Sequence, residues 1–167
     1  RYIADIANAD RTLTPVMTTP KYFRYPYLAE GAGDKKLAVQ QYLTQHQYTV
    51  APVTIDSKDY RFNERLLRIH WRSRPKHLNR IKQQYLGYIW HQTQRAEKKN
   101  PNRKQILLIH ANLLNSHFMG DLIQMYKRHG YRFITLEEAL AESDPEIVDE
   151  RVTTLTPEWV SPLGTEW

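Results

Sequence analysis

Apolar residues recur along this chain in short runs, and the spacing within each run predicts the elements of the fold. Apolar positions three and four residues apart indicate helices, whereas continuous or β-branched apolar runs indicate strands. The spacing predicts helices over residues 2–13, 35–47, 63–72, 75–98, 116–129 and 135 to about 141. It predicts strands over residues 21–25, from about 53 to 55, 106–109 and 131–134.

Local signals support several of these boundaries. Pro75 suits the first turn of a helix, and Gly130 follows a turn rich in cations, which is typical of a helix end. Thr135 and Glu138 have the spacing of a capping box. Because proline cannot donate to a sheet, Pro52 favours a strand that begins around Val53.

The predicted strands alternate with helices, which is the pattern of parallel βαβ units. We therefore expect an α/β fold, and 167 residues are enough for one domain. Only about four strands are predicted, whereas a closed (β/α) barrel typically needs roughly 200 residues or more. The chain therefore resembles the second half of a barrel.

The net charge of +6 conceals two regions of opposite sign. Residues 61–104 hold 13 Lys and Arg against 2 Asp and Glu, and residues 137–167 hold 9 Asp and Glu against 1 Arg. The basic region is either an anion-binding surface or the solvated face of helices. No nucleic-acid motif accompanies it, so a nucleic-acid partner is not favoured.

Other sequence features narrow the class of protein. The chain has no cysteine, which excludes disulfides and thiol catalysis. No apolar run approaches the roughly 18 residues of a membrane span, so no span is expected. The sequence shows no signal peptide, because its first residues contain no apolar core segment.

Ionisable residues stand where three of the apolar runs end. Arg24 follows the first, Asp56 and Asp59 follow the second, and His110 follows the third. Side chains at the carboxyl ends of parallel strands line the catalytic mouth of many α/β enzymes. Simpler explanations remain open, namely a surface ion pair for Arg24, an Asx turn for the aspartates and a packed histidine.

These segments, in this order, resemble the later motifs of the NodB-type polysaccharide deacetylases, carbohydrate esterase family 4. The matching segments are Arg24-Tyr25-Pro26-Tyr27, Asp56-Ser57-Lys58-Asp59-Tyr60 and Leu108-Ile109-His110. The continuation through Asn112 and Asn115 is similar to one group within the family. The resemblance implies a distorted (β/α) barrel, with residues 1–142 as its C-terminal part and residues 143–167 as an acidic, proline-containing tail.

The resemblance also implies roles in amide hydrolysis. It makes His110 the general acid that protonates the leaving amine, and it places Leu108 at the pocket for the acetyl methyl group. It assigns Arg24 to hold the catalytic carboxylate, while Pro26 fixes a turn from which the N–H of Tyr27 stabilises the oxyanion.

Roles for the remaining residues of the middle motif are less specific. Asp56 and Asp59 are expected to orient Arg24 or to raise the basicity of His110. Tyr60 stands where the family commonly has tryptophan, and it is expected to shape one wall of the substrate groove.

The family's first two motifs, an Asp-Asp pair and His-x-x-x-His, do not occur in this sequence. The resemblance assigns them the catalytic base and the ligands of a divalent metal, which it implies is zinc in the complete enzyme. We therefore expect a chain that is inactive alone, that needs a preceding segment of the same domain, and that acts on acetylated glycans of the cell envelope or outside the cell. Exposed sheet edges favour homo-oligomers. The alternatives are a glycan-binding module without activity and a basic nucleic-acid-binding module.

Overall fold

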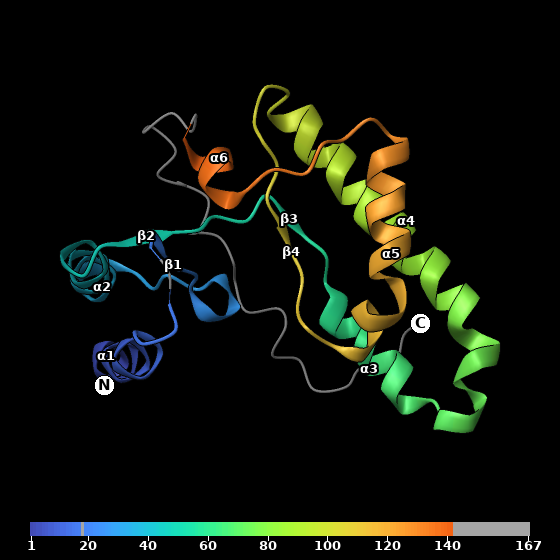
Figure 1. Cartoon of the computed structure of the whole chain (residues 1–167), viewed down its shortest axis with the longest axis horizontal. Helices are drawn as coiled ribbons and strands as arrows, with labels where there is room; N and C mark the ends of the chain where they lie inside the picture. The colour runs from blue at the N-terminus through green and yellow to red at the C-terminus, as the bar shows by residue number, and fades with distance from the viewer. Residues whose placement is uncertain (18, 142–167) are drawn as a thin grey trace. The chain divides into compact units, whose positions relative to one another are not determined.

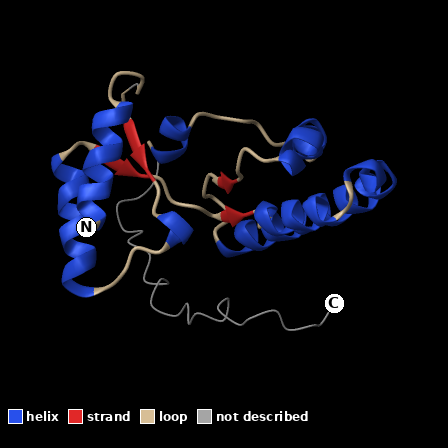
Figure 2. Cartoon of the chain, turned by 90° about the horizontal axis from the view of Figure 1, so that it is seen from below, coloured by secondary structure: helices blue, strands red, loops and turns tan. Residues whose placement is uncertain are grey.

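The computed structural model describes residues 1–17 and 19–141 (Figure 1). The acidic tail expected over residues 143–167 lies outside the described residues. Within the domain expected over residues 1–142, the described chain forms two compact units, residues 1–51 and residues 52–141. Helices make up most of the described chain, and the strands are short (Figure 2).

The first unit is a small βαβ arrangement preceded by a helix. Strands β1 and β2 pair in parallel, with Lys21 opposite Tyr48 and Phe23 opposite Val50. Helix α2 connects them, as parallel pairing requires. The elements in chain order are α1 (Tyr2–Leu13), β1 (Lys21–Phe23), the 3₁₀ turn η1 (Pro26–Leu28), α2 (Gly33–Gln45) and β2 (Tyr48–Val50).

A small apolar core holds the first unit together. Its buried members are Ile6, Tyr25, Val39 and Leu43. A polar cluster adds to it, because Asp10 of α1 accepts from the Tyr48 hydroxyl at 2.6 Å and from Lys21 Nζ at 2.9 Å. This carboxylate links the first helix to both strands.

The second unit is a βαβ arrangement extended by two further helices. Strands β3 and β4 pair in parallel, with Ile55 opposite Leu107 and Asp56 opposite Leu108. Helices α3 and α4 lie between them in sequence. The elements are β3 (Ile55–Asp56), α3 (Asp59–Arg68), the 3₁₀ turn η2 (Trp71–Ser73), α4 (Arg74–Lys99), β4 (Leu107–Leu108), α5 (Leu113–Arg128) and α6 (Leu136–Leu140).

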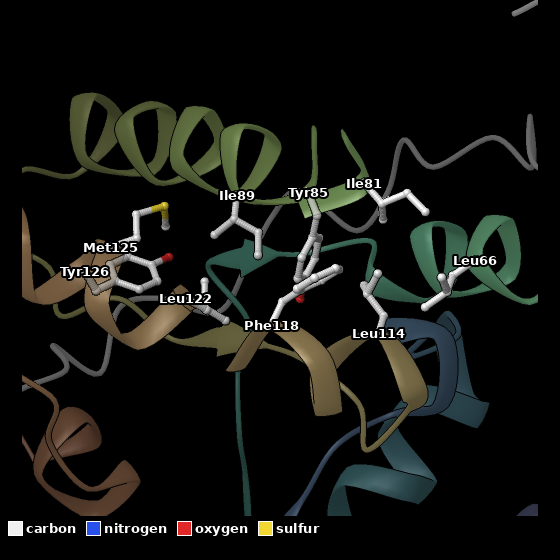
Figure 3. Close-up of a cluster of buried hydrophobic side chains, with 9 residues drawn as sticks. All are labelled: Leu66, Ile81, Tyr85, Ile89, Leu114, Phe118, Leu122, Met125 and Tyr126. Carbon is white, nitrogen blue, oxygen red and sulfur yellow. The ribbon is translucent and has the colours of Figure 1, made fainter. Parts of the chain in front are cut away.

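The main core of the second unit lies between α4 and α5. Figure 3 shows side chains of α4 pointing toward side chains of α5, with Leu66 of α3 at one end. All nine are buried: Leu66, Ile81, Tyr85, Ile89, Leu114, Phe118, Leu122, Met125 and Tyr126. On α4 the spacing of 81, 85 and 89 is that of one helical face.

The α/β organisation with parallel pairs is confirmed, but the described residues form no closed barrel. The four strands make two separate two-stranded sheets, β1 with β2 and β3 with β4. The predicted helices are all present, and the Thr135 side chain caps α6 by accepting from the N–H of Glu138 at 3.1 Å.

Several predicted boundaries were wrong, each for an identifiable reason. Residues 131–134 form no strand, because no described strand pairs with them and a strand needs a ladder of hydrogen bonds. Pro52 does not mark the start of a strand but separates β2 from β3. Helix α3 begins at Asp59 rather than at 63, because Lys58 adopts a left-handed conformation that turns the chain directly into the helix.

The helix expected from residue 116 also begins earlier than predicted. Asn112 caps α5, and its side chain accepts from the N–H of Asn115 at 2.9 Å. This cap moves the first turn of the helix next to His110. Among residues 1–17 and 19–141, no helix is both long and apolar enough to cross a membrane.

Candidate active site

Asp59 and His110 meet where β3 and β4 end. Because these strands are parallel neighbours, the segments that follow them leave the same edge of the sheet. The His110 Nδ1 atom lies 2.7 Å from Asp59 Oδ1. Asp59 is fully buried, whereas the side chain of His110 is 55% exposed. The pair therefore has a buried acidic member and a histidine that faces solvent.

The Asp59 carboxylate receives three further hydrogen bonds, all at Oδ2. The donors are the backbone N–H of His110 at 2.7 Å, Asn112 Nδ2 at 3.0 Å and Asn115 Nδ2 at 2.7 Å. Surrounded by N–H donors, the carboxylate acts as an acceptor only. The Nδ1 atom of His110 is then the donor to Oδ1.

Two helix starts surround this carboxylate. Asp59 is the first residue of α3, and Asn112 is the N-cap of α5. The positive end of a helix dipole stabilises a nearby negative charge. Local structure therefore holds a carboxylate in a buried position that would otherwise be unfavourable.

The turn between β3 and α3 aims Asp59 toward His110. Lys58 has φ 49°, a left-handed conformation that is unusual for a residue with a Cβ atom. Its N–H donates to Asp56 Oδ1 at 3.0 Å, which forms an Asx turn, and its Nζ lies 2.8 Å from Asp56 Oδ2. Burial opposes the charge on Lys58, but the hydrogen bond to Asp56 raises its pKa. Asp56 shapes the turn, and Asp59 contacts the histidine.

Tyr60 directly follows Asp59 in sequence, and Leu108 precedes His110 by two residues. Leu108 is a half-buried residue of β4, and its carbonyl accepts from the N–H of Ser57 at 3.4 Å. Tyr60 on α3 is 48% exposed, and the guanidinium of Arg61 lies 6.0 Å from the centre of its ring. Both belong to the same unit as Asp59 and His110.

Arg24, Pro26 and Tyr27 belong to the first unit. Arg24 is partly buried, and its Nε donates to the carbonyl of Ala51 at 3.4 Å. Burial lowers the pKa of the Arg24 guanidinium. Within the described residues of the first unit, Arg24 takes part in neither the Lys21–Asp10 nor the Lys36–Glu30 ion pair.

The turn after Arg24 carries unusual backbone geometry. Pro26 begins η1, and the two residues after it both have positive φ, 56° at Tyr27 and 59° at Leu28. Such conformations in residues with a Cβ atom are strained, and they concentrate at functional sites. The side chain of Tyr27 is 87% exposed.

The described residues do not form the metal site that the resemblance implies. No group of three His, Asp or Glu side chains among residues 1–17 and 19–141 is arranged to hold a metal ion. That finding does not bear on the metal of a complete enzyme.

Sequence reasoning gave no role to Asn112, Asn115 or Tyr85. Asn115 is buried and contacts both partners of the pair, and Tyr85 of α4 donates to Asn115 Oδ1 at 2.7 Å. The two asparagines three residues apart, directly after His110, are a sequence signal for a capped helix start. Nothing in the sequence links Tyr85 to them.

The chain matches no model of a known protein family, no curated protein and no solved structure.

Proposed function

We propose that this chain is the C-terminal part of a polysaccharide deacetylase with a NodB-type barrel, and that it carries the general acid of the reaction. The reaction is hydrolysis of an acetyl group from an acetylated glycan. The observation that supports this most directly is the Asp59–His110 pair, because it leaves a solvent-facing imidazole nitrogen at the carboxyl ends of two parallel strands.

The chemistry required of His110 follows from the leaving group. Water adds to the acetyl carbonyl and forms a tetrahedral intermediate, whose C–N bond then breaks. An amine leaves poorly unless its nitrogen is protonated as that bond breaks, and a histidine can supply this proton. In its protonated form His110 would donate from Nε2 to the nitrogen. Asp59 would hold the ring in place and stabilise the imidazolium.

The resemblance assigns stabilisation of the oxyanion to the backbone N–H of Tyr27, a residue of the first unit. A backbone N–H aimed at the developing oxyanion lowers the barrier of acyl transfer. The strained turn at Tyr27 is consistent with that role. Arg24 would pair with the carboxylate that takes a proton from water, and this base has to come from outside the described residues.

The base and the metal ligands of the family have no counterpart in this sequence, which lacks Asp-Asp and His-x-x-x-His. The chain alone would therefore be inactive. In the complete enzyme, a preceding segment of the domain would close the barrel and carry the metal. Its glycan would be met in the cell envelope or outside the cell.

Acetate release from oligomers of N-acetylglucosamine tests the proposal. We expect no release by the 167-residue chain alone. A longer chain that continues upstream in its own reading frame, and that contains both missing motifs, is expected to release acetate when a divalent metal is supplied. In that longer chain, His110→Ala should lower the rate strongly, while His91→Ala, a change at an exposed residue of α4, should not.

Absence of acetate release by the longer chain would contradict the proposal. Retained binding of the same oligomers would then favour the alternative of a glycan-binding module without activity. Release of acetate that is unaffected by His110→Ala would contradict the role given to the histidine.

One observation favours a second candidate, a basic module that binds nucleic acid. Several exposed cations of α3, η2 and α4 have no carboxylate partner among the described residues: Arg61, Arg65, Arg72, Lys76 and Arg80. A protein that neutralises phosphates loses affinity steeply as salt is added. Tight, salt-sensitive binding to duplex or single-stranded nucleic acid at physiological salt would support this candidate, and no binding there would exclude it.

A further inference from the structure

Asn115 is a buried amide with a defined orientation. Its Nδ2 donates to Asp59 Oδ2 at 2.7 Å and to the carbonyl of His110 at 2.9 Å. Because both partners are acceptors, the amide nitrogen must face them and Oδ1 must face away. Asn115 is 3% exposed, so no bulk water is available to satisfy its oxygen.

Tyr85 supplies the hydrogen bond that this oxygen needs. Its hydroxyl lies 2.7 Å from Asn115 Oδ1, and since an amide oxygen only accepts, the phenol must donate. Tyr85 is fully buried in the core between α4 and α5 (Figure 3). The centre of its ring lies 5.3 Å from that of Phe62. Burial and the charge of Asp59 raise the pKa of Tyr85, which keeps its proton in place.

Loss of this hydroxyl would weaken the position of His110 through two further hydrogen bonds, from Asn115 to Asp59 and from His110 to Asp59. Asn115 Oδ1 would be left buried without a donor, which is unfavourable. The amide would relax away from this position and weaken both bonds made by Nδ2. Asp59 would then be held less firmly, and its bond to His110 Nδ1 would be made in fewer molecules.

From this chain of contacts we propose that Tyr85 and Asn115 act together as positioning residues, a buried brace that fixes Asp59 and keeps the ring proton of neutral His110 on Nδ1. Neither touches the substrate, because Tyr85 is fully buried and Asn115 almost so. The brace extends the site into the main core. The inference rests on the proposed function only in taking His110 as the acid.

The titratable groups around the pair are few among the described residues. Asp59 on α3 contacts the ring directly, and Tyr85 on α4 acts through Asn115. Asp56 and Lys58, on the turn between β3 and α3, are paired with one another. The position of the ring proton therefore reports mainly on Asp59 and on what holds it.

The test is the imidazole ¹⁵N spectrum of the 167-residue chain, recorded at alkaline pH where the ring is neutral. We expect the Nδ1–H form of His110 to predominate in the unaltered chain. Tyr85→Phe, which removes only the hydroxyl, should lower the ratio of Nδ1–H to Nε2–H several-fold. Because the ring is observed directly, failure of this test is distinguishable from failure of the deacetylase assay.

Tyr126→Phe is the matched control. Tyr126 belongs to the same core, is 5% exposed, and its hydroxyl is bonded to Thr93 Oγ1 at 2.8 Å. Its loss removes a buried hydroxyl without touching Asn115. A purely structural effect would change both variants alike, whereas the brace predicts a change of the His110 ratio in Tyr85→Phe alone.

An unchanged His110 ratio in folded Tyr85→Phe would overturn the inference. If that variant does not fold, hydrogen exchange of side-chain amides in the unaltered chain decides instead. The Nδ2 protons of Asn115 should exchange far more slowly than those of Asn79, which is exposed on α4. Equal exchange rates would show that the brace does not hold.

Discussion

The carboxylate of Asp59 lies 2.7 Å from the Nδ1 atom of His110, although the two residues are 51 positions apart in the chain. Asp56, an aspartate of the same turn, makes no such contact and instead closes the turn onto Lys58. The two aspartates of one sequence motif thus have different tasks, and substitution can separate them.

Asp59→Asn should lower the free energy of unfolding by about 2 kcal/mol, since it replaces a buried carboxylate with four donors by a neutral amide. Asp56→Asn, which affects a more exposed ion pair, should cost less than about 1 kcal/mol. Urea unfolding of both variants measures the difference. Equal losses would mean that the Asp59 network contributes no more than the turn does.

A general acid is needed most when the leaving group is poor. In the longer, active chain of the proposed function, His110→Ala should slow cleavage of an acetamide by about 10²-fold to 10⁴-fold. Cleavage of an aryl acetate, whose phenolate leaves without a proton, should change far less. The two rates are measured on the same preparations, and an equal loss for both substrates would argue against proton donation by His110.

Asp10 makes the stability of the first unit depend on pH. Hydrogen bonds from Tyr48 and Lys21 lower the pKa of Asp10 below its ordinary value of 3.8. The stabilisation is therefore present above that value and is lost as the pH falls through the lowered pKa. Asp10→Asn should flatten this acid dependence, measured by amide exchange of residues 21–50, whereas Asp5→Asn, on the exposed face of α1, should leave it unchanged.

Tyr48 makes the stability of the same cluster decrease at alkaline pH. Burial and the hydrogen bond to Asp10 raise the pKa of Tyr48 from 10.0 to about 12. Its contribution is present below pH 10.0 and is lost as the pH rises toward about 12. Tyr48→Phe should reduce this alkaline dependence, and the remainder is expected from Tyr25 and Tyr2, whose pKa values are also raised by burial. An unchanged dependence in the variant would contradict this contribution of Tyr48.

Tyr25 carries a hydroxyl that is buried without a hydrogen-bond partner among the described residues. An unpaired buried hydroxyl destabilises the folded chain, so Tyr25→Phe should raise the free energy of unfolding by about 1 kcal/mol. Tyr126→Phe, which breaks a bond to Thr93, should lower it by a similar amount. Destabilisation by Tyr25→Phe would mean that the hydroxyl is bonded in the folded chain.

Sequence patterns located the helices well because each helix shows its buried face as a local spacing. On α4, residues 81, 85 and 89 lie on one face and are all buried. Strands were less predictable, since residues 131–134 have strand-like composition but no neighbour to pair with in the described chain. The composition of a segment shows whether it is suited to form a strand, whereas strand pairing depends on residues far away in the sequence.

In the candidate site, too, local patterns were predictable from the sequence and long-range contacts were not. Asp59 and His110 were both predictable as site residues, because each follows a strand and fits a motif. The partnership of Tyr85 with Asn115, 30 positions away, was not predictable. The ring of Tyr85 lies on the buried face of α4 with residues 81 and 89, which fully explains an aromatic residue at this position. Only the fold shows that its hydroxyl is engaged as well.

Tyr85 has a consequence for any effort to engineer this protein. Its ring belongs to the core between α4 and α5, and its hydroxyl belongs to the network behind His110. A redesign that treats the interior as freely exchangeable apolar volume would accept phenylalanine there, because the exchange nearly conserves volume. Such a library, screened only for a packed core, would retain variants whose histidine is no longer held in place.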